Sequence, residues 1–320
     1  MKFLRSQALR SLALAASLAL SLGAAAAPQV EDPEGTLVES VVITARTPGP
    51  AWWKVSDGDS VVWILATPDG PLPPGVAWDH SVVERRLKGA NTLIDGISLN
   101  AGLRDLPALL RLRSQLKSKT PLEPGLPADL RDRFVADRTR LGKPAKRYAD
   151  WTPLAAGLML LGDTRGGGRW GHPDNEIRRL AKKAKVPIKE SARYDAVPFL
   201  QKAVAGLTPA THQQCLESAL DDIDANGRLR PAAEGWAKGN VQAALTAPRA
   251  VERCVLLLAG GADLWRRSSR DQAQSIAEAL KKPGHSVALV SLRRLLAKDG
   301  VLELLRARGF TITGPGESTS

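Results

Sequence analysis

The sequence contains few cysteines, few histidines and few aromatic side chains other than tryptophan. Its 320 residues include 2 Cys, 4 His, 4 Phe and 2 Tyr, against 8 Trp. Two cysteines exclude a small fold built on many disulfides. Long apolar runs are absent beyond the N-terminus, which excludes a membrane protein with several spans, and 43% hydrophobic residues exclude a disordered chain. The composition that remains is that of a basic globular protein with one large or two small domains.

The N-terminus has the pattern of a secretory signal peptide over residues 1–26. Lys2, Arg5 and Arg10 supply positive charge before a short apolar run at residues 11–22, and small alanines follow this run. The run is short for a bilayer span, so an uncleaved anchor is the less favoured alternative. We therefore expect a periplasmic or secreted protein whose mature chain has no transmembrane span.

Basic residues exceed acidic residues by 45 to 33, which gives a net charge of +12. Cleavage of the signal peptide would remove three of the basic residues and leave +9. This balance favours anionic surroundings, such as an envelope polysaccharide or lipid head groups. The basic residues are scattered and are not interleaved with aromatics, so nucleic acid is not an expected partner.

The two cysteines, Cys215 and Cys254, are expected to form a disulfide. They lie 39 positions apart, and two thiols in an oxidising compartment are more often paired than free. The alternative is two buried thiols. Metal binding is not indicated, because neither cysteine has a histidine or a second cysteine at short spacing.

Periodicity and turn residues divide the chain into a flexible leader at 27–50, one α/β domain at 51–315 and a tail at 316–320. The leader contains one strand-like run at 38–45. Strands of the domain are expected at 52–56, 61–66, 92–97, 186–190, 286–290 and 310–313. Helices are expected at 81–88, 106–116, 128–141, 153–161, 175–185, 197–205, 212–223, 231–237, 251–258, 268–280 and 292–308.

The strands lie mainly near the two ends of the domain, and helices fill its middle. This order predicts an α/β fold with a mixed sheet built from N-terminal and C-terminal strands and a large helical middle section. Pro187 indicates an edge position or a strand start, because proline cannot donate a ladder hydrogen bond. Asp174 is the expected N-cap of the helix at 175–185, and Asp299 and Gly300 predict a break in the last helix.

Six segments resemble the TraB/GumN family in their order and spacing. Together they extend over most of residues 51–315. The matching segments are Trp52–Val55, Asp57–Thr67, Leu72–Gly75, Asn91–Ile94, Val186–Glu190 and Val287–Phe310. The resemblance implies the same α/β domain that the strand and helix patterns predict.

In the TraB/GumN family, the first strand ends in Gly-Thr-x-His, the second carries a Glu, and the closing segment carries another His. The resemblance implies a divalent-metal site at these positions, and some members are described as metal-dependent peptidases. Here Thr67 is kept, but Asp69 replaces the first His. Gly96 replaces the Glu, and Arg294, a permanent cation that cannot bind a metal, replaces the second His. All three expected ligands are therefore absent.

Other residues near these positions are candidates for a site. Neighbouring side chains of a strand point to opposite faces, so Asp95 should point away from the family site that Gly96 would face. Glu190 matches a strand-end glutamate of the family, and it either lines the cleft or pairs with basic neighbours. We expect Asp69 and Arg294 to form a salt bridge across the cleft.

The remaining residues with reactive or aromatic side chains carry weaker signals. No two histidines have ligand spacing, and no Gly-x-Ser-x-Gly motif indicates a serine nucleophile. The glycine run at 166–168 is not followed by Lys-Ser or Lys-Thr, so no phosphate-binding loop is indicated. The tryptophans could stack on sugars, but core packing is favoured because Phe and Tyr are scarce.

Together these patterns predict an exported, catalytically inactive pseudoenzyme that acts as a binding or scaffold module in the cell envelope and holds no cofactor. Its degenerate site comprises Thr67, Asp69, Gly96, Glu190 and Arg294. The alternative is a metal-dependent, peptidase-like hydrolase with a rearranged site. In that interpretation a divalent metal is bound by Asp69, Asp95, Glu190 or one of the histidines.

Overall fold

The computed structural model describes residues 49–165 and 169–316. The expected signal peptide, the leader as far as residue 48 with its strand-like run, the glycine run and the tail beyond residue 316 lie outside the described residues. Among the residues described, no helix is both long and apolar enough to cross a membrane.

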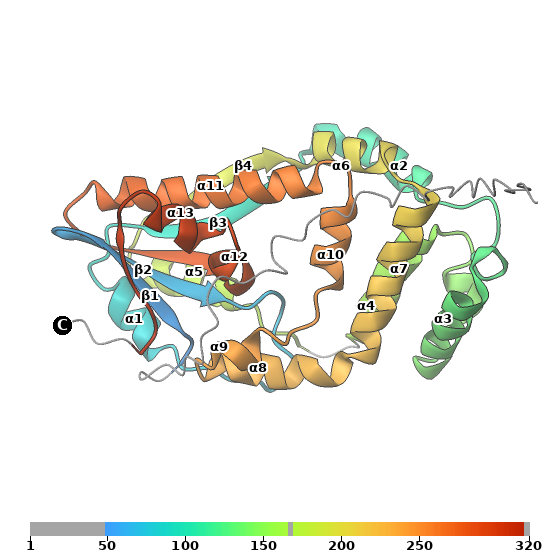
Figure 1. The fold of residues 1–320 in the computed structure, drawn as a ribbon, viewed down its shortest axis with the longest axis horizontal. Coiled ribbons are helices and arrows are strands. Elements are labelled where there is room, and N and C mark those ends of the chain that lie inside the picture. Colours follow the sequence, from blue (N-terminus) through green and yellow to red (C-terminus); the bar gives the residue numbers. More distant parts are fainter. Residues whose placement is uncertain (1–48, 166–168, 317–320) are drawn as a thin grey trace, which may run out of the picture. The chain divides into compact units, whose positions relative to one another are not determined.

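A six-stranded mixed sheet forms the centre of the fold (Figure 1). The strand order is β4-β3-β5-β2-β1-β6, in which β1 is antiparallel to both β2 and β6 and the other neighbours are parallel. The predicted sheet of N-terminal and C-terminal strands is thus confirmed, with β2 and β5 side by side. The strands are β1 (Trp52–Asp57), β2 (Ser60–Thr67), β3 (Leu93–Asn100), β4 (Ile188–Asp195), β5 (Gly284–Ser291) and β6 (Thr311–Thr313).

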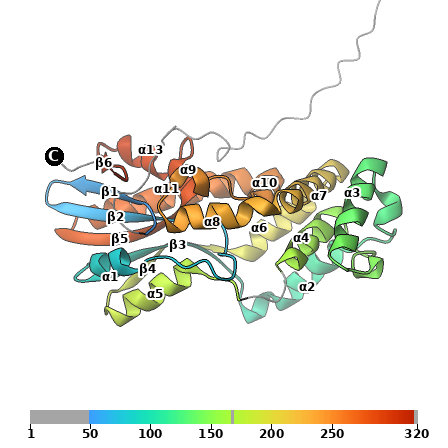
Figure 2. The ribbon, with the colours of Figure 1, turned by 90° about the horizontal axis from the view of Figure 1, so that it is seen from below.

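Successive side chains of a strand point to opposite faces of the sheet, and in the central strands both sets are buried, because helices cover both faces. Trp53 and Ile64 pack under one helical layer, whereas Trp52 and Leu65 pack under the other. Figure 2 shows α1 and α5 on one side of the sheet and α11 and α13 on the other. The helices of these layers are α1 (Ser81–Leu87), α5 (Pro173–Lys183), α8 (Leu229–Ala237), α9 (Val241–Ala244), α11 (Gly261–Leu280), α12 (Leu292–Leu296) and α13 (Val301–Arg306).

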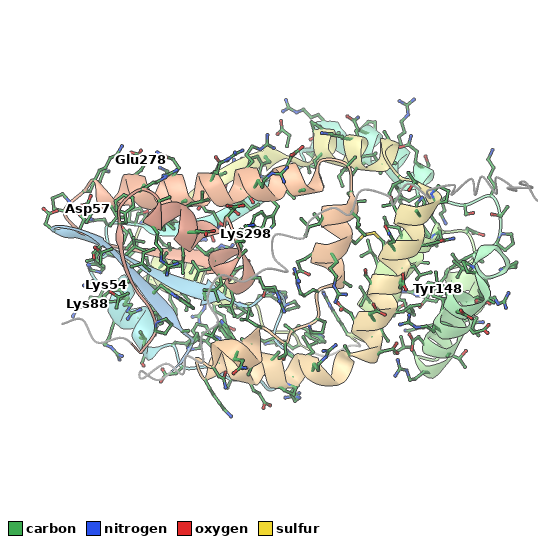
Figure 3. All side chains as sticks on the ribbon, viewed as in Figure 1. Lys54, Asp57, Lys88, Tyr148, Glu278 and Lys298 are labelled. Atoms are coloured by element: carbon green, nitrogen blue, oxygen red, sulfur yellow. A yellow bond between two sulfur atoms is a disulfide. The ribbon has the colours of Figure 1, made fainter. Side chains whose placement is uncertain are left out.

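The remaining helices form a second packed region, which contains the helical middle of the sequence. Its core includes Phe134, Tyr148 (labelled in Figure 3), Leu160 and Leu216. Tyr148 donates a 2.6 Å hydrogen bond to Asp163. Burial and this hydrogen bond raise the pKa of the Tyr148 phenol. The helices are α2 (Leu106–Gln115), α3 (Ala128–Arg140), α4 (Pro153–Thr164), α6 (Ala196–Ala205), α7 (Pro209–Asp224) and α10 (Ala250–Leu257).

A disulfide joins Cys215 of α7 to Cys254 of α10, as the cysteine count predicted. Both cysteines are buried beside Leu154 of α4. The crosslink therefore ties together two helices whose sequence separation is 39.

Several details differ from the sequence-based expectations. The helix α11 begins at Gly261, seven residues before the predicted start at 268, and β3 continues to Asn100. Asp174 is not the N-cap of α5, because the helix begins at Pro173 with His172 in the capping position. Proline is favoured at the first position of a helix, where its missing N–H is not needed. β4 continues beyond Glu190 to Asp195 because it pairs with β3 as far as Asn100. The short helix α9 was not expected.

Other details follow the expectations. β4 is an edge strand that begins one residue after Pro187. The last helix is interrupted between α12 and α13, where Asp299 has a φ of 57°. Seven of the eight tryptophans lie in or against a hydrophobic cluster, Trp170 being the exception.

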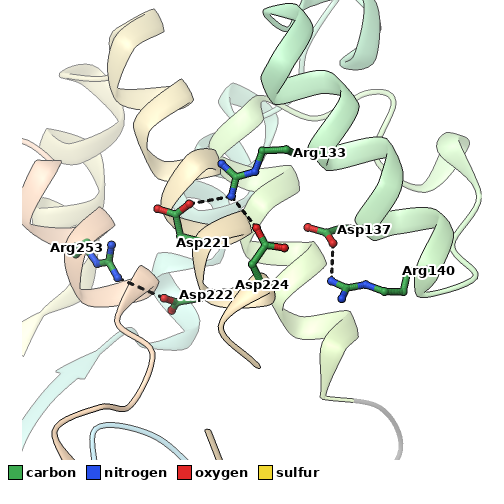
Figure 4. Close-up of polar contacts among 7 residues, drawn as sticks. All are labelled: Arg133, Asp137, Arg140, Asp221, Asp222, Asp224 and Arg253. Atoms are coloured by element: carbon green, nitrogen blue, oxygen red, sulfur yellow. Dashed lines mark hydrogen bonds and ion pairs between the residues drawn. The ribbon is translucent and has the colours of Figure 1, made fainter. Parts of the chain in front are cut away.

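Carboxylates near the end of α7 connect this helix to its neighbours (Figure 4). Arg133 of α3 bonds to Asp221 and Asp224, at 2.8 and 2.9 Å. The buried Asp222 accepts hydrogen bonds from the backbone N–H groups of Arg249 and Ala250, where α10 begins. Asp222 therefore caps α10 from a different helix, and this tertiary contact helps to position α10.

We expect Asp222→Ala to lower the free energy of unfolding by about 1–3 kcal/mol, because one buried and one partly buried N–H group lose their acceptor. The matched control is Asp221→Ala on the same helix, whose exposed ion pair should contribute less than about 1 kcal/mol. Urea unfolding followed by tryptophan fluorescence measures both. Equal losses for the two variants would contradict the capping role.

Candidate functional site

A polar pocket of about 460 Å³ lies where β2 and β5 end. Thr67 and Asp69 line it at the end of β2, and Ser291 and Arg294 line it at the end of β5. These residues meet because parallel strands present their carboxyl ends at the same edge of a sheet, which is where open α/β folds bind ligands. The opposite walls come from α5 and α10.

Asp69 is held by a buried ion pair with Arg293. The side chains are 5% and 6% exposed, and Oδ2 of Asp69 lies 3.3 Å from Nε of Arg293. Arg293 also donates hydrogen bonds to the carbonyl oxygens of Leu245 and Ala247. One guanidinium thus connects α12 both to the loop after β2 and to the segment after α9.

A second arginine–carboxylate pair joins α5 to β3 at the wall of the pocket. Arg178 lines the pocket and bonds to Asp95 of β3 through two nitrogens, at 2.5 and 3.1 Å. The hydrogen bond to Asp95 raises the pKa of Arg178 above its ordinary value. Arg178 also donates to Asn175, one turn earlier on α5. Its guanidinium is therefore fixed in position and permanently charged.

Asp174 differs from these paired carboxylates. It lines the same pocket from the first turn of α5, and no described side chain donates a hydrogen bond to it. Burial raises the pKa of Asp174 above its usual range, with Arg178 acting in the opposite direction. The pocket therefore contains a carboxylate that takes up a proton more readily than an ordinary aspartate.

The fold and the pocket define a class: an α/β protein with a mixed sheet and a polar site at the carboxyl ends of its parallel strands. Within this class, the sequence pattern of the TraB/PrgY/gumN family matches residues 51–314, and the chain belongs to that family. No curated protein and no solved structure matches the chain in the corresponding comparisons.

The structure brings together three of the five predicted site residues. Thr67, Asp69 and Arg294 line the pocket, whereas Gly96 and Glu190 do not. Glu190 accepts a 3.0 Å hydrogen bond from Ser98 and pairs with Arg193 at 2.9 Å. The hydrogen bond from Arg193 is the main cause of the lowered pKa of Glu190. Of the two alternatives for Glu190, the structure thus shows the ion pair.

The expected salt bridge between Asp69 and Arg294 stays a prediction, although both residues line one pocket. The structure shows Asp69 paired with the adjacent Arg293. Asp95 lies on the same side of the sheet as Leu93, toward α5, and reaches the pocket only through Arg178. Sequence reasoning missed Arg178, which lies on α5, just before the matching segment Val186–Glu190.

The residues present do not fit the divalent metal that the family resemblance implies. Asp69 lies against a buried guanidinium, Gly96 offers no side-chain donor, and Arg294 brings a cation into the pocket wall. In the described part of the chain, no three His, Cys, Asp or Glu side chains are grouped to hold a metal ion.

The four histidines lie apart from one another. His172 lines the pocket, whereas His80 bonds to Glu176 at 3.0 Å. His285 bonds to the carbonyl oxygen of Arg86, and His212 is half-buried beside α2 and α6. No pair of them forms a ligand set or a catalytic dyad.

A second pocket, of about 230 Å³, adjoins the first and shares Asp69, Gly70, Pro71 and Glu252 with it. Trp170 lines this second pocket and donates a hydrogen bond to the carbonyl oxygen of Arg165. The one tryptophan outside the hydrophobic clusters thus lies beside the polar site.

We expect Asp69→Ala to lower the free energy of unfolding by about 3–5 kcal/mol, because it leaves a buried guanidinium without its carboxylate. The double variant Asp69→Leu/Arg293→Met should recover part of this loss, since it removes both charges but also removes the donor to the carbonyl oxygens of Leu245 and Ala247. Asp57→Ala, at the exposed end of β1 (Figure 3), serves as a control and should change stability by less than about 0.5 kcal/mol. Unfolding in guanidinium chloride measures the free energy of unfolding of all three variants. A loss below about 1 kcal/mol in Asp69→Ala would contradict the role of the pair.

Proposed function

We propose that this protein is a catalytically inactive member of its family that binds a polar ligand in the cell envelope. One observation carries the proposal: buried Arg293 neutralises Asp69, and Arg294 lines the pocket at a position where the family resemblance implies a metal-binding histidine. A metal ion would have to approach both cations, so the pocket favours binding through charge pairs over metal catalysis.

The pocket walls carry both signs of charge, which suits a zwitterionic ligand such as a peptide. Arg178 and Arg294 can receive a carboxylate, and Asp174 can receive an ammonium group. Of the two aspartates that line the pocket, Asp174 is the better acceptor because Asp69 is already paired. Trp170, in the adjoining pocket, offers a flat apolar surface for the rest of the ligand.

Export to the cell envelope is part of the same proposal. The basic and apolar N-terminal pattern predicts a signal peptide, and the disulfide between Cys215 and Cys254 suits an oxidising compartment. The excess of basic residues favours an anionic polysaccharide or lipid nearby.

The alternative function, a metal-dependent hydrolase, would need Asp69, Asp95, Glu190 or a histidine as ligands. Asp69, Asp95 and Glu190 are each engaged by an arginine. His172 is the one histidine among the residues that line the pocket. This alternative therefore requires at least one of these ion pairs to open.

We expect the purified full chain to retain far less than one metal ion per molecule after incubation with Mn²⁺ or Zn²⁺ and removal of free metal. Inductively coupled plasma mass spectrometry provides the measurement. One tightly held ion per chain would contradict the proposal, as would peptide turnover that a chelator and Asp69→Asn both abolish.

We expect the dipeptide glycylglycine to bind less tightly as the pH falls, and this loss should begin above pH 3.8, the ordinary pKa of aspartate. The reason is that Asp174 has a raised pKa, so protonation removes the acceptor of the ligand's ammonium group at a higher pH than usual. Isothermal titration calorimetry across the acidic range measures the effect.

Asp174→Asn should bind weakly at all pH values and lose this dependence. The control is Glu176→Gln on the same helix, whose carboxylate bonds to Trp78 and His80 outside the pocket. A pH dependence that persists in Asp174→Asn would contradict the assignment.

A further inference from the structure

The helix α2 and the turn before it present leucines to solvent. Leu103, Leu106 and Leu110 are 86%, 51% and 63% exposed, and Leu99 at the end of β3 is also exposed. Only six large apolar side chains are exposed in the described residues, and these are four of them. The exposed leucines are therefore concentrated in one short segment.

Leu106 and Leu110, four residues apart, lie on one side of α2, and Leu112 lies on the opposite side. Leu103 belongs to the one-turn 3-10 helix Leu103–Asp105 just before α2. We call the three exposed leucines, Leu103, Leu106 and Leu110, the leucine face. Leu112 is buried and lines a pocket with Val204 of α6, against which α2 packs (Figure 1). The leucine face thus points away from the protein's own core, and it lines none of the pockets described above.

Unpaired basic side chains flank the leucine face. Arg104, Arg111 and Arg113 have no carboxylate within salt-bridge distance among the described residues, and neither does Lys117, just after the helix. The arginines of α3 differ, since each of them is paired: Arg131 with Asp132, Arg133 with Asp221, Arg138 with Glu123 and Arg140 with Asp137. The sole acidic residue of the turn, Asp105, accepts a hydrogen bond from the N–H of Gly102.

A tryptophan lies beside these basic groups. Nζ of Lys117 is 3.9 Å from the ring centre of Trp151, and the guanidinium carbon of Arg113 is 5.6 Å from it. Trp151 is partly exposed, and tryptophan is enriched at the boundary between lipid and water.

We infer that α2 docks this protein on an anionic lipid surface. The leucine face would enter the region between head groups and acyl chains, while the flanking arginines contact lipid phosphates. A bilayer fits better than a protein partner because the leucines protrude and offer no groove, and because unpaired cations lie on both sides of the apolar face. The inference concerns a different surface from the polar pocket, although it suits the proposed location in the envelope.

The test compares full-length chains by co-sedimentation with vesicles. We expect wild-type protein to bind vesicles of equal parts phosphatidylcholine and phosphatidylglycerol, and to bind pure phosphatidylcholine far less. The variant Leu103→Gln/Leu106→Gln/Leu110→Gln should bind the anionic vesicles about tenfold more weakly or worse. Residues 1–48 are the same in every chain, so the comparison isolates the contribution of α2.

Two further variants sharpen the test. Leu158→Gln, which alters an exposed leucine of α4, is the matched control and should bind as wild type does. Arg104→Gln/Arg111→Gln/Arg113→Gln should lose the preference for anionic vesicles, and raising the salt concentration should weaken the wild type in the same way. Circular dichroism verifies that each variant is folded.

Several outcomes would overturn the inference. These are wild-type protein that does not sediment with anionic vesicles, a leucine variant that binds as wild type does, and an effect of Leu158→Gln equal to that of the leucine variant. Analytical ultracentrifugation adds another: conversion of a wild-type dimer to a monomer by the leucine variant would identify the face as a contact between two copies. None of these outcomes bears on glycylglycine binding at Asp174, so the two proposals fail separately.

Discussion

The buried pair between Asp69 and Arg293 is the interaction on which the rest of the site depends. Neither charge could remain buried at its position without the other, because an unpaired buried ion costs several kcal/mol. The pair joins the loop after β2 to the helix after β5, and hydrogen bonds from Arg293 extend the connection to the segment after α9. The charge pair thus lies at the edge of the sheet where the polar pocket is found.

The same principle governs other charges in and near the pocket. Asp95 is paired with Arg178, which lines the pocket, and Glu190, outside it, is paired with Arg193, so neither carboxylate has the freedom to bind a metal unless its arginine moves away. Asp174 keeps that freedom, because no described side chain donates a hydrogen bond to it, and burial raises its pKa. A pocket organised in this way suits the binding of a charged ligand that we propose.

Much of the fold could be predicted from local patterns. The hairpin of β1 and β2, the edge position of β4 and the break after α12 follow from turn residues, a proline and a glycine, whose effects are local. The start of α5 was misplaced because Asp174 is a good capping residue, yet Pro173 fits the first helical position and His172 takes the cap. The extent of β4 was underestimated because pairing with β3, and not local propensity, sets where that strand ends.

The sequence by itself determined the alternation of strands and helices, the resemblance to the family and the presence of two cysteines able to pair. Only the tertiary structure decided which charges meet. Adjacent residues of a helix point about 100° apart, so the packing of α12 sets how Arg293 reaches Asp69 and where Arg294 meets the pocket. The exposure of the α2 leucines was decided in the same way, since an apolar stripe on a helix is buried or free according to what the rest of the chain places against it.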